Sequence, residues 1–156
     1  MAHFPIIELT EHKLDAYDWM QEEDLWDDAF IESHTDYIQD VDSSEERKEW
    51  LTWLPEFFEG LADVDLDKDE IRFKSEKEIK KTLDDYYREI VENMENTDSK
   101  GWRRFLDIRR YGECYKDTDA IFYVSGCSQS SMQFIEDCYH YAGQTVYIGG
   151  VVDAHV

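Results

Sequence analysis

The feature that most constrains this chain is the concentration of acidic residues in its first half. Residues 8–49 contain 16 acids and 3 bases, and the formal charge is −19 over residues 1–70 against −3 over residues 71–156. Carboxylates at this density repel one another, so they must lie in water while the apolar side chains between them turn toward a core. We therefore expect short amphipathic elements in this half, with the acids outside.

The composition indicates a folded domain. Of the 156 residues, 42% are hydrophobic and 15% aromatic, too many for a disordered acidic tail and enough to bury a core. No apolar run approaches the roughly 20 residues of a membrane helix. The first residues lack a signal-peptide pattern, and the three cysteines are an odd number. We expect a single globular domain over residues 1–156 in the cytoplasm, that of the host cell if the protein is phage-encoded, with reduced thiols.

Helical periodicity dominates the first 70 residues. Glu11, Asp15, Asp18 and Glu22 fall on one stripe of a helix expected over residues 11–22, and a second helix is expected over 24–32. Ser43 followed by Glu46 has the pattern of a helix N-cap. The third helix is expected to run from there to Pro55, which breaks it, kinks it or starts the next turn.

The second half mixes helix and strand patterns. A strand is expected over 71–74, and the capping box of Ser75 and Glu78 opens a long amphipathic helix that ends near Asn96. Strands at 120–124 and 145–148 flank a helix at 129–142, and this order predicts a parallel pair with a right-handed crossover. The two glycines at 149–150 are expected to end the last strand.

The predicted fold class is α+β. A helical, acidic N-terminal half, residues 1–70, packs with a small sheet in the α+β half, residues 71–156. That sheet includes the C-terminal strand–helix–strand unit. The pattern of residues 101–111 fits either helix or strand.

The sequence predicts no metal site and no cofactor. Asp65, Asp67 and Asp69 resemble the start of an EF-hand calcium loop, but Glu70 stands where the loop needs glycine. A solvated acidic loop that binds a cation weakly at most is the better interpretation. The histidines and cysteines have no paired spacing typical of zinc ligands.

No catalytic residue is predicted either. Cys127 lies in a run of small residues before an expected helix, where a helix N-terminus would lower the pKa of a thiol. His140 lies about three turns further along that helix, so no base is placed beside the thiol. Small residues in a tight turn explain the segment without chemistry, and a small enzyme that uses Cys127 stays an alternative.

One basic patch interrupts the acidity. It consists of Arg103, Arg104, Arg109 and Arg110. We expect these arginines to pair with the acidic half, either within the fold or across a homodimer.

The charge excludes some partners and favours others. A chain of net charge −22 is a poor ligand for DNA, RNA or anionic membranes. Acids one helical turn apart lie about 5–6 Å from one another, a spacing comparable with that of phosphates along one strand. The size and charge are similar to those of small phage and mobile-element proteins that inhibit restriction enzymes or CRISPR effectors by mimicking nucleic acid.

The first hypothesis is therefore an acidic inhibitor or decoy that blocks a basic DNA- or RNA-binding protein. The alternative is a bacterial immunity protein that neutralises a basic nuclease toxin. The predicted partner-binding residues are the acids of the first half: Glu11, Asp15, Asp18, Glu22, Glu23, Asp24, Asp27, Asp28, Glu32, Asp36, Asp40, Glu45, Glu46 and Glu49.

Overall fold

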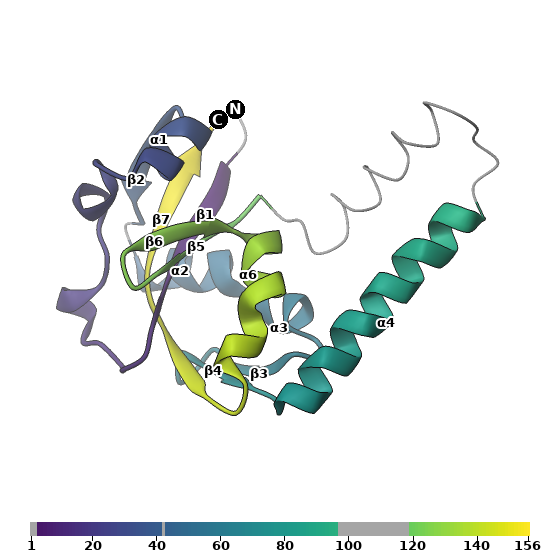
Figure 1. Cartoon of the computed structure of the whole chain (residues 1–156). Helices are drawn as coiled ribbons and strands as arrows, with labels where there is room; N and C mark the ends of the chain where they lie inside the picture. Colours follow the sequence, from purple (N-terminus) through teal and green to yellow (C-terminus); the bar gives the residue numbers. More distant parts are fainter. Residues whose placement is uncertain (1–2, 42, 97–118) are drawn as a thin grey trace.

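The computed structural model describes residues 3–41, 43–96 and 119–156 (Figure 1). The strands are β1 (His3–Thr10), β2 (Tyr37–Asp40), β3 (Ala62–Asp65), β4 (Glu70–Phe73), β5 (Ile121–Val124), β6 (Cys127–Ser130) and β7 (Thr145–His155). The α-helices are α1 (Ala29–His34), α2 (Ser44–Leu51), α3 (Leu54–Phe57), α4 (Glu76–Glu95) and α6 (Ser131–Asp137). The described residues also form three 3₁₀ turns: η1 (Ala16–Asp18), η2 (Glu22–Leu25) and η3 (Cys138–Tyr141).

The strands form one mixed sheet around β7. Its order is β3-β4-β7-β1-β5-β6, and β2 also pairs with β7. One edge of β7 is antiparallel to β1 over almost its whole length. The other edge pairs first with β4, at residues 145–147, and then with β2, at residues 152–155. Strands from both halves of the sequence thus meet on β7.

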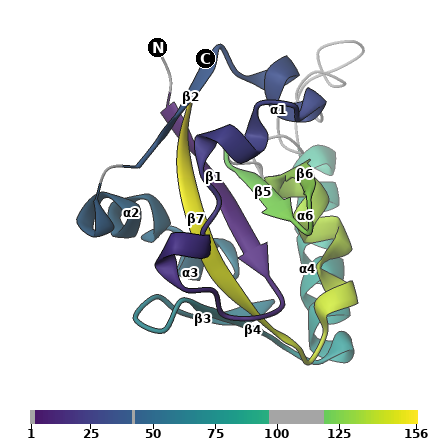
Figure 2. The same ribbon diagram turned by 90° about the vertical axis from the view of Figure 1, so that its left-hand side faces the viewer.

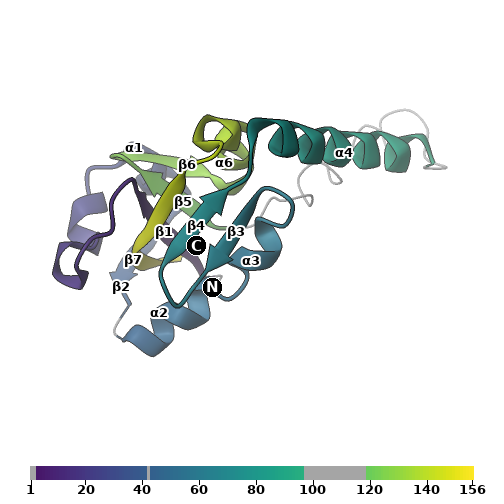
Figure 3. The same ribbon diagram turned by 90° about the horizontal axis from the view of Figure 1, so that it is seen from below.

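Helices and 3₁₀ turns cover the two faces of this sheet. On one face an aromatic core that includes Phe58, Phe122 and Phe134 packs between the sheet and α2, α3, α4 and α6. On the other face Met20, Leu25 and Ile31 pack against the sheet from η2, α1 and the loop before them. Figure 2 shows this second layer in front of β1 and β7, and Figure 3 shows α4 extending beyond the sheet.

The α+β fold class and the helix starts with strong capping patterns are confirmed. The Ser43 hydroxyl accepts a hydrogen bond from the Glu46 amide at 3.1 Å and begins α2. The Ser75 hydroxyl accepts from the Glu78 amide, and the Glu78 carboxylate accepts from the Ser75 amide, so the capping box begins α4 as expected. Pro55 lies in the first turn of α3, where its missing N–H costs nothing.

The helix expected over residues 11–22 is wrong, and so is the early start of the next helix. Carboxylates accept hydrogen bonds from amides that a continuous helix would need. Oε2 of Glu8 accepts from the Met20 amide at 2.9 Å, and Oδ1 of Asp40 accepts from the Glu22 amide at 2.7 Å. Such bonds compete with helix formation. Asp28 caps α1 by accepting from the amides of Phe30 and Ile31, so that helix begins only at Ala29.

The two glycines do not end the last strand. Ile7 pairs with Val151 and Leu9 with Ile148, so Gly149 and Gly150 together lie opposite Glu8 as a β-bulge. A Cβ on Gly149 would lie 2.1 Å from the Glu8 carboxylate, and one on Gly150 would lie 2.3 Å from the Met20 carbonyl oxygen. The glycines therefore permit a close approach, and β7 continues to His155.

The predicted parallel crossover is also wrong. β5 is parallel to β1, and β7 is antiparallel to β1 on its other side. Strand β6 forms a hairpin with β5 before α6 begins. The strand–helix–strand unit therefore connects strands that are not neighbours, because β1 occupies the place between them.

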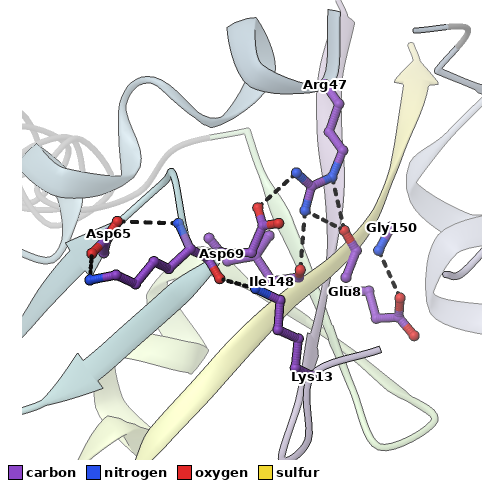
Figure 4. Close-up of polar contacts among 9 residues, drawn as sticks. Glu8, Lys13, Arg47, Asp65, Asp69, Ile148 and Gly150 are labelled. Atoms are coloured by element: carbon purple, nitrogen blue, oxygen red, sulfur yellow. Dashed lines mark hydrogen bonds and ion pairs between the residues drawn. The ribbon is translucent and has the colours of Figure 1, made fainter. Parts of the chain in front are cut away.

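The side chain of Arg47 fills the gap between β4 and β2 along the edge of β7 (Figure 4). Its guanidinium donates to the carbonyl oxygens of Ile148 and Gly149 at 2.8–3.1 Å. It also pairs with Asp69 at 2.8 Å and stacks on the ring of Trp19. On the bulge the Glu8 carboxylate accepts from the Gly150 amide at 2.7 Å. Arg47 thus supplies hydrogen bonds to β7 in the gap between β4 and β2, and Glu8 supplies one in the bulge opposite β1.

We predict that Arg47→Met lowers the free energy of unfolding by about 3–5 kcal/mol, because it leaves the Asp69 carboxylate and two carbonyls without their donor. Methionine keeps the length of the aliphatic stem. The measurement is urea unfolding, with Lys48→Met as the control, because Lys48 is the exposed neighbour on the same helix. Equal losses in the two variants would contradict the role given to Arg47.

Candidate partner-binding surface

The predicted partner-binding acids are carried by three parts of the fold. The segment from β1 to α1 covers one face of the sheet, β2 pairs with an edge of β7, and α2 packs on the other face. Arg47 on α2 contacts Trp19, so α2 lies next to the segment that precedes α1. We call the exposed residues of this stretch, 11–49, the acidic surface. The regular stripe expected for Glu11, Asp15, Asp18 and Glu22 does not form, because no single helix carries them.

Some of these acids hold the fold together. Asp28 caps α1 and accepts from the Ser128 hydroxyl at 2.7 Å, which connects α1 to β6. Asp24 accepts from the Gln21 amide at 2.9 Å, and Asp40 from the Glu22 amide. These carboxylates accept hydrogen bonds from backbone amides. Replacing them would therefore change the conformation of the surface as well as its charge.

Other acids make no such bond. Within the described residues their carboxylates are exposed and accept no hydrogen bond. We call this set the open carboxylates: Glu11, Asp18, Glu23, Asp27, Glu32, Asp36 and Glu49.

The described part of the fold does not neutralise this surface. No described carboxylate from Glu11 to Glu45 has a lysine or arginine within ion-pair distance inside the described ranges. Two of the three nearby bases are used elsewhere, because Lys13 donates to the Lys68 carbonyl oxygen and Arg47 is buried against β7. The ion pairs of lysine and arginine instead join acids between residues 65 and 85.

Two tyrosines respond to the negative field. The hydrogen bond from the Tyr17 hydroxyl to Asp15, helped by the charge of Asp18, raises the pKa of Tyr17. Burial raises the pKa of Tyr123, and the carboxylates of Asp28 and Asp24 raise it further. The carboxylates add to both shifts, whose first causes are the hydrogen bond of Tyr17 and the burial of Tyr123.

Large aromatic side chains are exposed among these acids. Tyr17 is 82% exposed and Trp26 is 65% exposed, although each belongs to a residue type that usually buries most of its surface. Exposed tryptophan and tyrosine are enriched at protein interfaces, where they supply the anchoring contacts. The acidic surface thus combines charge with apolar contact area.

A hollow of about 240 Å³ opens between the loop before η2 and α2. Trp19, Gln21, Ser44 and Arg47 contribute to its lining. Its volume is below the roughly 300–1,000 Å³ of typical small-molecule sites. This part of the surface is better suited to contact with a macromolecule than to enclosing a substrate.

Contrary to the sequence prediction, Cys127 does not lie directly before a helix. Cys127 begins β6 after a tight turn in which Ser125 and Gly126 have positive φ, and the helix begins four residues later, capped by Ser130. Cys127 therefore does not lie at the N-terminus of that helix, and His140 lies in η3 beyond it. Burial raises the pKa of the Cys138 thiol to about 12, so that thiol stays protonated at neutral pH.

The calcium-like loop is a turn between β3 and β4, and two of its three acids, Asp65 and Asp69, form ion pairs. Asp65 forms ion pairs with Lys68 and Arg72, and Asp69 with Arg47. Lys68 lowers the pKa of Asp65 through their hydrogen bond. The basic patch, Arg103, Arg104, Arg109 and Arg110, and the ambiguous segment 101–111 lie outside the described residues.

Comparison with protein-family models, with curated proteins and with solved structures gives no match. Among the described helices none is both long and apolar enough to cross a membrane.

Proposed function

We propose that the chain is an acidic inhibitor or decoy that binds a basic, nucleic-acid-handling protein through its acidic surface. The observation that carries the proposal is the set of open carboxylates, which have no counter-charge within the described part of the chain. A fold that keeps this repulsion loses stability. A basic partner would supply the missing positive charges. The acidic surface would then take the place of the nucleic acid that the partner binds. The proposal places the encounter in the cytoplasm.

The support comes from charge and not from a regular spacing of the acids. Exposed negative charge attracts a basic groove over a distance of about 8–10 Å at physiological salt, which accelerates association. The acids that would contact the partner first are the open carboxylates, which accept no hydrogen bond within the described residues. Asp28 and Asp40, which accept backbone hydrogen bonds, are better seen as supports for the surface.

We predict that the triple variant Asp18→Asn, Glu23→Gln and Asp27→Asn loses the partner while keeping the fold. The matched control is Asp84→Asn, Glu92→Gln and Glu95→Gln on α4, which removes the same charge from exposed positions outside the acidic surface. Each chain is immobilised and exposed to a lysate of the host cell. Bound proteins are then eluted with increasing NaCl and quantified by mass spectrometry.

The native chain and the control should retain a basic DNA- or RNA-binding protein that duplex DNA displaces. The triple variant should retain at most a small fraction of it. Equal retention by all three chains, or retention that NaCl and duplex DNA leave unchanged, would contradict the proposal.

The exposed aromatic residues favour a second candidate, an immunity protein that neutralises a basic nuclease toxin. Such a protein would bind through a compact centre in which one aromatic side chain carries much of the affinity. Trp26, exposed at the end of η2, is the best placed side chain for this role.

Trp26→Ala separates the two candidates. If the surface is a compact immunity-type interface, this change should weaken binding of the retained partner by about 2 kcal/mol or more. If the surface acts by charge alone, the loss should be no larger than for Tyr87→Ala, an equally exposed aromatic on α4. Calorimetric titration of the purified partner measures both variants.

A further inference from the structure

Three potential metal ligands meet at the end of the sheet where β1, β2 and β7 run side by side. His3 on β1 pairs directly with His155 on β7, and Asp153 lies two residues before His155 on the same face of the strand. One ligand atom from each of the three side chains lies within 4.8 Å of the other two. The strand register alone brings together residues about 150 positions apart in the sequence.

The buried histidine has an unmet need for a partner. His155 is only 2% exposed, and neither of its ring nitrogens has a hydrogen-bond partner among the described residues. Its Nε2 lies 3.1 Å from Oδ2 of Asp153, but the two atoms are not aligned as a hydrogen bond. A buried imidazole without partners is unfavourable. A cation beside Asp153 would use the free lone pair.

The distances suit a tetrahedral ion. Nδ1 of His3 lies 3.0 Å from Oδ2 of Asp153, close to the 3.1 Å of the His155 contact. Ligands about 2.0–2.1 Å from a tetrahedral zinc ion are about 3.3 Å from one another. Small side-chain rotations would therefore place three ligands around one ion. The half-exposed His3 leaves a side of the cluster open to water.

Neighbouring side chains hold the ligands in place. The Nε2 of Gln39 donates to Asp153 at 3.1 Å, and the ring of Tyr37 stacks on His155 with centroids 3.9 Å apart. Both residues lie on β2, directly opposite the ligands that they contact. Metal sites commonly fix their first ligands through such outer partners.

We propose that His3, Asp153 and His155 bind one divalent transition-metal ion, with Zn²⁺ as the preferred ion and water in the remaining position. Two imidazoles and one carboxylate are ligands that Zn²⁺ binds in sites with an open coordination position. Mg²⁺ and Ca²⁺, which prefer oxygen ligands, should bind here more weakly. The site shares β2 with the acidic surface, but none of the open carboxylates is among its three ligands.

Zinc competition on the full, tag-free chain tests the proposal. Zn²⁺ is titrated against a chromophoric chelator in a large excess of Mg²⁺, which occupies the exposed carboxylates. The native chain should take up one Zn²⁺ per molecule. His3→Ala and Asp153→Asn should each weaken Zn²⁺ binding by at least about 100-fold, the upper range for loss of an outer partner.

His12→Ala and Asp63→Asn are the matched controls, since both residues are exposed and lie away from the cluster. They should leave the affinity unchanged, and His3→Ala should keep the native circular dichroism because His3 is half exposed. Co²⁺ in place of Zn²⁺ should show the visible absorption of a four-coordinate ion, absent from His3→Ala. Uptake that disappears in excess Mg²⁺, or that His3→Ala and Asp153→Asn do not weaken, would overturn the proposal.

Discussion

The contact of the Arg47 guanidinium with β7 is the interaction on which the rest of the structure depends. β7 joins β1, β2 and β4, yet among the described strands none pairs with its edge between β4 and β2. Arg47 fills this gap with hydrogen bonds to the carbonyls of Ile148 and Gly149, while Glu8 satisfies the Gly150 amide in the bulge. Because one strand carries both halves of the sheet, these contacts also fix where the acidic segment and the His3 cluster lie.

The acids of the first half have two physical roles that the fold separates. Those that follow a turn or precede a helix, such as Asp24 and Asp28, accept backbone hydrogen bonds and replace a regular helix with short turns. The open carboxylates do not stabilise the described fold in this way, and their mutual repulsion opposes it. Arg47 is buried against the sheet, so one of the three bases of this stretch is withdrawn from the surface.

Local signals in the sequence predicted local structure well. Ser43, Ser75 and the periodicity of residues 76–95 were sufficient to place α2 and α4, since capping and amphipathicity act within a few residues.

Strand β1 and the continuation of β7 past Gly150 depend on pairing between the two ends of the chain, and no local pattern records that pairing. The cluster of His3, Asp153 and His155 was missed for the same reason. The alternation of Asp153 and His155 along a strand was the one available signal. Which acids remain open could not be predicted, because capping and open carboxylates look alike in sequence.

The acidic surface carries negative charge that the described part of the fold does not neutralise. This residual charge is tested most directly by the free energy of unfolding as a function of NaCl concentration for the native chain and the two triple variants.

NaCl should stabilise the native chain, because it screens the repulsion among these carboxylates. The triple variant Asp18→Asn, Glu23→Gln and Asp27→Asn should have a free energy of unfolding about 1 kcal/mol higher than the native chain at low salt. High salt should remove this gain. The α4 variant, at Asp84, Glu92 and Glu95, should show a smaller gain, because lysines and Arg88 lie among the acids of that helix. The contrary result is a native chain whose stability is independent of NaCl, with no gain in the first variant. It would mean that the charge of the acidic surface is already neutralised.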